Sequence, residues 1–167
     1  MGMNEIQEIQ LKLRQLIKIH LNLFDVQTTK KQAIIQNKLE LISSTMKDEL
    51  EHTRYIRKIQ SEMLSICRAY LVQQNIPITE PLTLEQVIEV VEDGDKEQLL
   101  TLKEGLVGAI DSLKQIVNQN QELLKQSLEF IQLTMDLVAP DLDIYNYGTD
   151  RPIDQTQEVR SSFDSKA

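Results

Sequence analysis

Apolar residues recur along residues 95–139 at steps of three and four, which places them on one face of a helix. The positions are Leu99, Leu102, Leu106, Ile110, Leu113, Val117, Leu124, Leu128, Ile131, Met135 and Val138. A helix of about 45 residues is roughly 68 Å long, which exceeds what a small globular domain needs. A rod of this length suits the holding of another chain better than the building of a catalytic pocket.

The same periodicity predicts a first helix over residues 4–24 and a second over 29–74. The stripe of the first helix consists of Ile6, Ile9, Leu13, Leu16, Ile17 and Phe24, with His20 on the same face. Asp25–Thr29 is expected to turn the chain, because Thr29 and Gln32 have the spacing of a capping box. At about 32 Å, this first helix is much shorter than the other two.

The apolar seam of the second helix has two parts. The first consists of Ile35, Leu39, Ile42 and Met46, and the second of Ile56, Ile59, Met63, Cys67 and Tyr70. Between them the seam positions hold Glu49 or Leu50 and then Thr53, so we expect a shift of register there.

The connection after the second helix is itself predicted to be structured. Asn75–Pro77 ends that helix, and a short helix over residues 83–92 carries Leu84, Val87, Ile88 and Val91. Thr83 and Gln86 repeat the capping-box spacing, and Asp95 is expected to cap the last helix. The fold class is therefore all-α: an elongated antiparallel three-helix bundle over residues 1–139 with a short helical corner. Residues 140–167 are expected to form a mobile acidic tail.

Charge and composition narrow the functions. The formal net charge is −8 and there is one cysteine, Cys67, which fits a reducing cytoplasm. Residues 28–71 are basic, with eight Lys or Arg against five acids, whereas residues 76–98 hold seven acids and one lysine. An acidic chain is not expected to bind nucleic acid, and no apolar run is long enough for membrane insertion.

Nothing in the sequence favours an enzyme or a cofactor. Glu49 and His52 have the Glu-x-x-His spacing of di-iron bundles, but a second copy is lacking, so we expect no metal site. We read His52 as an exposed helix residue, His20 as a rim residue and Cys67 as a core residue. Gly105 and Gly108 interrupt the last helix and allow either a close helix approach or a bend.

Two features of the last helix point to a partner. Asn120 lies on the seam, where it either sets the register of helix pairing or contacts a partner's backbone. Beyond it, apolar residues cover more than one face, and the short first helix cannot shield them all. We therefore predict a surface that captures an amphipathic helix of a client protein. Its residues are Asn120, Leu123, Leu124, Leu128, Ile131, Met135 and Val138.

Three segments carry a resemblance to a known family. Lys30–Ile35 leads through Leu39, Ile42 and Glu49 to Arg57, Asn118–Leu124 opens the last half-helix, and Tyr147 and Gly148 follow Pro140. With the order of the elements, these segments resemble FlgN-type flagellar export chaperones of Gram-positive bacteria.

The resemblance implies a cytoplasmic type III export chaperone. Such a protein binds the carboxy-terminal helices of FlgK- and FlgL-like hook–filament junction proteins, prevents their premature assembly and delivers them to the flagellar export gate. Tyr147 and Gly148 would then dock on the gate, and the chaperone would be a monomer or weak dimer. A self-associating structural coiled coil remains the alternative, and a metal-carrying helical bundle a more distant one.

Overall fold

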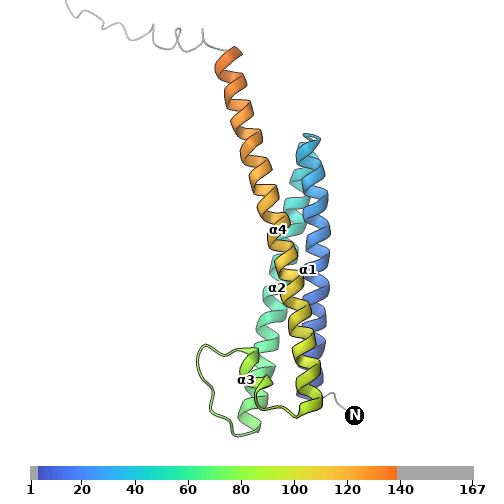
Figure 1. Cartoon of the computed structure of the whole chain (residues 1–167), viewed down its shortest axis with the longest axis vertical. Helices are drawn as coiled ribbons and strands as arrows, with labels where there is room; N and C mark the ends of the chain where they lie inside the picture. The colour runs from blue at the N-terminus through green and yellow to red at the C-terminus, as the bar shows by residue number, and fades with distance from the viewer. Residues whose placement is uncertain (1–3, 139–167) are drawn as a thin grey trace, which may run out of the picture. The chain divides into compact units, whose positions relative to one another are not determined.

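The computed structural model describes residues 4–138 and contains four α-helices and no strand within them (Figure 1). They are α1 (Glu5–Ile35), α2 (Leu39–Gln73), α3 (Leu84–Ile88) and α4 (Asp93–Val138). The all-α prediction is confirmed, and the predicted tail lies outside the described residues. Residues up to Gln126 form one compact unit, and α4 continues from Ser127 into a second unit.

The predicted turn at Asp25–Thr29 is wrong, because α1 continues through it to Ile35. The hydroxyls of Thr28 and Thr29 donate hydrogen bonds to the carbonyls of Phe24 and Asp25, four residues earlier. Neither threonine therefore caps a new helix. The turn lies at residues 36–38 instead, and α1 is 31 residues long, still shorter than the 46 residues of α4.

The helices α1 and α2 are each followed by an asparagine whose backbone lies in the left-handed region. Asn37 has a φ of 54° and Asn75 a φ of 56°. In each case the next residue's amide donates back to a carbonyl five residues earlier, Lys38 to Ala33 and Ile76 to Leu71. This is the Schellman arrangement, which satisfies carbonyls at a helix end and which asparagine adopts at low cost.

The short helix lies at the predicted corner but covers only Leu84–Ile88 of the predicted residues 83–92. Thr83 is the N-cap of α3 but makes no capping hydrogen bond with its side chain. The Gln86 amide instead bonds Thr79 and the Pro81 carbonyl. The predicted capping box is therefore absent, and Gln86 fastens the connecting loop to α3.

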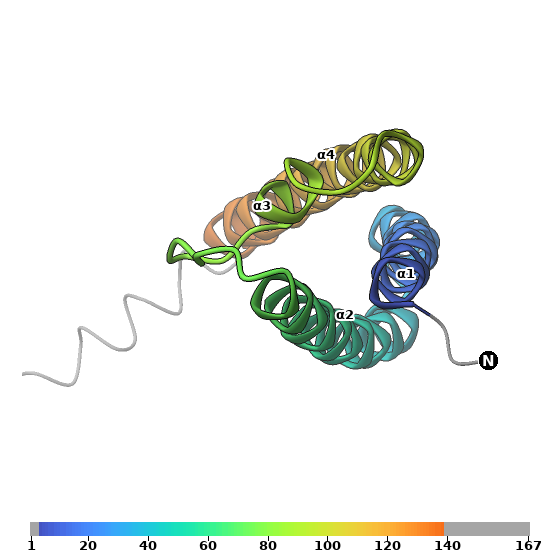
Figure 2. The ribbon, with the colours of Figure 1, turned by 90° about the horizontal axis from the view of Figure 1, so that it is seen from below.

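The end of the first unit that contains α3, here called the corner end, holds the main apolar core. Figure 2 shows the ends of α1, α2 and α4 around this core, with α3 on the side between α2 and α4. The buried members are Ile6, Ile9, Leu13, Leu16, Ile59, Met63, Cys67, Leu71, Leu84, Val87, Ile88, Val91 and Leu99. The stripes predicted for residues 56–70 and 83–92 are confirmed here. The stripe predicted for residues 4–24 is confirmed from Ile6 to Leu16, whereas Ile17 and Phe24 are half-buried outside this cluster.

The opposite end of this unit, here called the turn end, surrounds the α1–α2 turn and differs from the prediction. Of the seam residues expected there, Leu39 is 77% exposed and Met46 is 56% exposed. The buried α2 residue in this region is Thr45, whose hydroxyl bonds the Ile42 carbonyl. The apolar seam of α2 therefore faces the core only from about Ile56 onward.

Candidate functional site

The last turns of α4 carry a dense group of exposed apolar side chains. We call the stretch from Leu128 to Val138 the end segment. Its exposed members are Leu128, Phe130, Ile131, Leu133, Met135, Leu137 and Val138, with exposed fractions between 53% and 79%. Exposed apolar residues occur singly on most proteins, so seven within eleven positions make this segment the candidate interaction surface.

The end segment presents two apolar stripes rather than one. Leu128, Ile131, Met135 and Val138 follow steps of three, four and three and form the first stripe. Phe130, Leu133 and Leu137 follow steps of three and four and form the second, on the other side of the helix. The prediction that apolar residues cover more than one face is therefore confirmed.

The charges beside these stripes are all negative. Glu129 and Asp136 are exposed, and no Lys or Arg lies between Leu128 and Val138. The Gln132 amide donates a hydrogen bond of 3.0 Å to the Asp136 carboxylate. An apolar helix bordered by carboxylates suits a partner helix bordered by basic side chains.

Asn120 is buried, with an exposed fraction of 2%. Its amide nitrogen donates to the Gln27 carbonyl oxygen at 2.8 Å and to the Gln27 Oε1 at 2.9 Å. Its own Oδ1 is buried and has no partner among the described residues. The structure thus supports the register interpretation of Asn120 and removes it from any exposed client surface.

The Asn120 contact belongs to a polar chain that joins three helices. The Gln27 amide donates to the Glu49 carboxylate at 2.6 Å, and the Lys30 ammonium approaches the same carboxylate at 2.8 Å. Glu49 is therefore the α2 end of a network that runs through α1 to α4. This network occupies the place at which the sequence predicted a register shift on α2.

The remaining predicted site residues divide between the first unit and the undescribed part of the chain. Leu123 and Leu124 are half-buried in the first unit. Leu128, Ile131, Met135 and Val138 are exposed in the end segment. Tyr147 and Gly148 lie outside the described residues.

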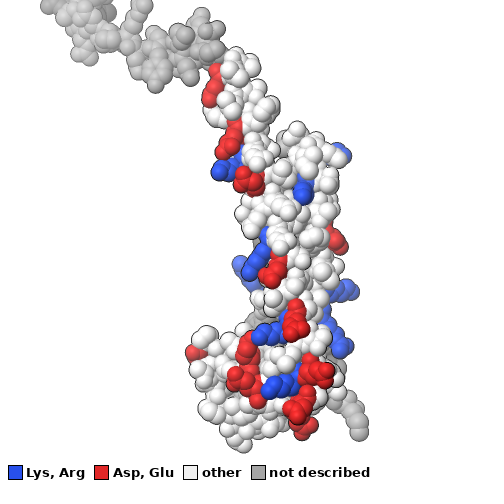
Figure 3. Space-filling view, viewed as in Figure 1, with Lys and Arg blue, Asp and Glu red and all other residues white. Residues whose placement is uncertain are grey.

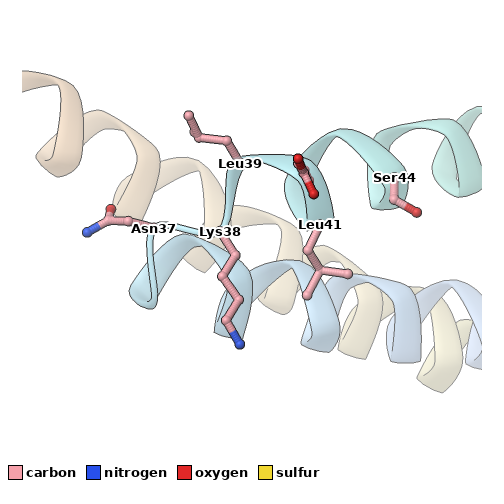
Figure 4. Close-up of a pocket in the computed structure, with 6 residues that line it drawn as sticks. Asn37, Lys38, Leu39, Leu41 and Ser44 are labelled. Atoms are coloured by element: carbon pink, nitrogen blue, oxygen red, sulfur yellow. The ribbon is translucent and has the colours of Figure 1, made fainter.

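Sequence reasoning missed a second exposed apolar surface on α2. Leu39, Met46 and Leu50 are all more than half exposed. Beside them, Asn37, Lys38, Leu39, Glu40, Leu41 and Ser44 line a pocket at the turn (Figure 4). In Figure 4 Leu39 points away from α1, whereas Leu41 lies over it. The available signal was Thr45 and Glu49, polar residues at positions that a buried seam would fill with apolar ones.

Charged side chains gather at the corner end, where they pair. Figure 3 shows both signs mixed over α3 and the start of α4. Lys103 pairs with Glu85 across these helices, and the hydrogen bond lowers the pKa of the Glu85 carboxyl. Arg68 and Lys12 lower the pKa values of Glu80 and Glu62 in the same way. These charged residues therefore form structural contacts within the first unit.

The cysteine and the two histidines, which could carry chemistry, have structural roles. Cys67 is fully buried, and desolvation raises the pKa of its thiol to about 11, so it is a core residue as predicted. His20 is buried rather than at the rim, and His52 is half-buried rather than exposed. The Nδ1 of each lies within hydrogen-bonding distance of the carbonyl four residues earlier. Residues 4–138 contain no group of three or more His, Cys, Asp or Glu that could hold a metal.

The family model described as FlgN protein matches residues 1–151. The chain belongs to the FlgN family. FlgN proteins are flagellar export chaperones that bind hook–filament junction proteins, and the family is not an enzymatic one.

A relative in a Gram-positive bacterium matches nearly the whole chain. The uncharacterized protein YvyG of Bacillus subtilis (strain 168) is 24% identical over 157 residues, which cover 93% of this chain and 95% of YvyG. No solved structure matches the chain. No helix within residues 4–138 combines the length and apolar character that a membrane crossing requires.

Proposed function

We propose that this FlgN-family chaperone captures the carboxy-terminal amphipathic helices of FlgK- and FlgL-like junction proteins on the first stripe of the end segment. The observation that supports the proposal is the exposure of Leu128, Ile131, Met135 and Val138. Their alternating steps of four and three match the seam against which a second helix packs knobs into holes. Leu124 precedes Leu128 by four residues and extends the same spacing.

Capture of this kind explains how a chaperone would prevent premature assembly. A client helix destined for a filament core exposes an apolar face until its neighbours arrive. A complementary stripe binds that face and lowers the concentration of the free form by mass action. No nucleotide or cofactor is needed for this step, because binding alone shifts the equilibrium.

Paired aspartate substitutions test the stripe. Leu128→Asp with Met135→Asp should weaken client binding by about 100-fold or more, because two apolar contacts are replaced by charges that the client would have to desolvate. The matched control is Leu100→Asp with Val107→Asp, which changes two exposed α4 residues that are also seven positions apart. Calorimetric titration with a client's terminal peptide measures both.

The control should bind the client as the native chain does, and both variants should keep native helix content by circular dichroism. If the stripe variant retains native affinity, the client binds elsewhere. Equal losses in both variants would indicate a general electrostatic effect of added aspartates and would also contradict the proposal.

Delivery to the export gate is assigned to the segment around Tyr147 and Gly148, on the basis of the family resemblance. Removal of residues 141–167 should weaken binding to the gate's cytoplasmic domain while the client affinity changes by less than about threefold. Tyr147→Ala should reproduce part of the loss. Separate titrations with client peptide and gate domain distinguish the two roles, and a parallel loss of both affinities would contradict the division.

A further inference from the structure

The α2 surface at the turn end is a stripe that no described residue covers. Leu39, Met46 and Leu50 are spaced by seven and four residues, so they share one face of α2. At this level α4 contacts α1 rather than α2, through Asn120 with Gln27 and Lys31 with Gln119. The stripe is thus left open on the surface of the first unit.

Basic side chains border this α2 stripe. Leu50 follows Lys47 by three positions and precedes Arg54 by four, so the two bases flank it on the helix surface. Both are exposed, and neither forms an ion pair with another described residue. The acids Glu40, Asp48 and Glu51 lie about 100° or more from the midline of the stripe. Glu49 lies about 80° from it, on the side opposite Lys47, and is paired with Lys30.

The second stripe of the end segment has the opposite border. Leu133 follows Glu129 by four positions and precedes Asp136 by three, so two carboxylates flank it. Phe130, Leu133 and Leu137 form the apolar part, and all three are more than 60% exposed. These residues are not part of the stripe assigned to the client.

The two surfaces match in spacing as well as in sign. Lys47 and Arg54 are seven positions apart, and so are Glu129 and Asp136, which gives a rise of about 10.5 Å in each helix. In each case an exposed leucine lies between the charges. We propose that the second stripe of the end segment docks on the α2 stripe of a second copy of this chain, with Glu129 and Asp136 facing Lys47 and Arg54.

Each copy carries both surfaces. If a pair of copies forms the contact in both directions, each stripe is buried and neither is left open for further growth. The area of a few side chains per contact gives a weak, salt-sensitive dimer rather than a permanent one. The first stripe stays available, so dimerisation and client capture are separate properties.

Charge reversal and mixing test the contact. Sedimentation velocity over a range of concentrations should show the native chain shifting from monomer to dimer at low salt and less so at about 1 M salt. Lys47→Glu with Arg54→Glu should weaken the dimer by about tenfold or more, and so should Glu129→Lys with Asp136→Lys. An equimolar mixture of these two variants restores opposite charges at both contacts and should recover dimerisation.

The control is Lys18→Glu with Lys58→Glu, two exposed bases outside the α2 stripe, which should dimerise as the native chain does. If the native chain stays monomeric at every concentration, the proposal is overturned. This includes a monomer in which the end segment binds α2 of its own chain. A mixture that dimerises no better than either variant also overturns it. Client capture by the first stripe survives either result, so the two proposals fail independently.

Discussion

The corner end and the turn end of the first unit are built from the same three long helices, α1, α2 and α4, but are held together differently. At the corner end, side chains such as Leu13, Ile59 and Leu99 are fully buried in one apolar cluster. At the turn end, Gln27 and Glu49 connect the helices through hydrogen bonds, and Leu39 points outward. The difference teaches that most of the stability of the fold comes from the corner end, whereas the alignment of the helices is set at the turn end.

The magnitudes explain the separation. Burial of a large aliphatic side chain contributes about 1.5–3 kcal/mol, whereas a hydrogen bond contributes a net 0.5–1.5 kcal/mol or so. A hydrogen-bonded layer, however, tolerates only one alignment, because any shift leaves buried polar atoms without partners. The turn end is therefore expected to fix the register of α4 on α1 while opening more readily than the corner end.

The largest expected effect is at the corner end. Leu99→Ala should lower the free energy of unfolding by about 2–5 kcal/mol, because it leaves a cavity among buried side chains. Leu39→Ala, the matched change at an exposed leucine of the turn end, should alter it by less than about 0.5 kcal/mol. Urea titrations of the two variants measure the contrast, and similar losses would remove the distinction between the two ends.

A smaller effect is expected from the polar network. Asn120→Ala should cost about 1–3 kcal/mol, because the buried Gln27 side chain and carbonyl lose their donor. Gln119→Ala removes an exposed hydrogen bond between the same two helices and should cost less than about 0.5 kcal/mol. If Asn120→Ala proves as harmless as this control, the network does not determine how α4 pairs with α1.

The smallest effect concerns the two glycines of α4. A Cβ at position 108 would meet nothing within 4 Å, so Gly108→Ala should stabilise the protein by about 0.5–1 kcal/mol through helix propensity. A Cβ at position 105 would lie 3.4 Å from Ile17 Cδ1, so Gly105→Ala should gain less. Thermal unfolding of both variants shows which substitution raises the stability more. A larger gain at position 105 would contradict a close approach of α1 and α4 there.

The corner end was predictable from the sequence because its apolar positions repeat without interruption. Ile59, Met63 and Cys67 lie on one face of α2, which must be buried. Val87 and Ile88 are apolar neighbours on α3, so this helix packs against the same core. The helix pattern and the order of elements follow from such positions alone. The sequence did not decide whether Gly105 allows a close helix approach or a bend. That choice depends on whether a side chain of another helix, here Ile17, packs against position 105.

The turn end was not predictable in the same way, because polar residues there allow two interpretations. Thr28 and Thr29 suggested a boundary, yet their hydroxyls bond within α1. Asn37 was the better signal, since asparagine is one of the few residues that enters the left-handed region easily. The exposure of Leu39 and Met46 depended on where α1 ended, so one misplaced turn also misplaced the seam.

The final turn of α4 has an electrical consequence of its own. Carbonyl groups at the carboxyl end of a helix carry a partial negative charge, which lysine or arginine in the last turn would offset. That turn contains no basic residue, and Asp136 adds a further negative charge. Among residues 4–138 the macrodipole therefore has no basic partner in this turn, and a cation placed beside it would stabilise the last turns of the helix.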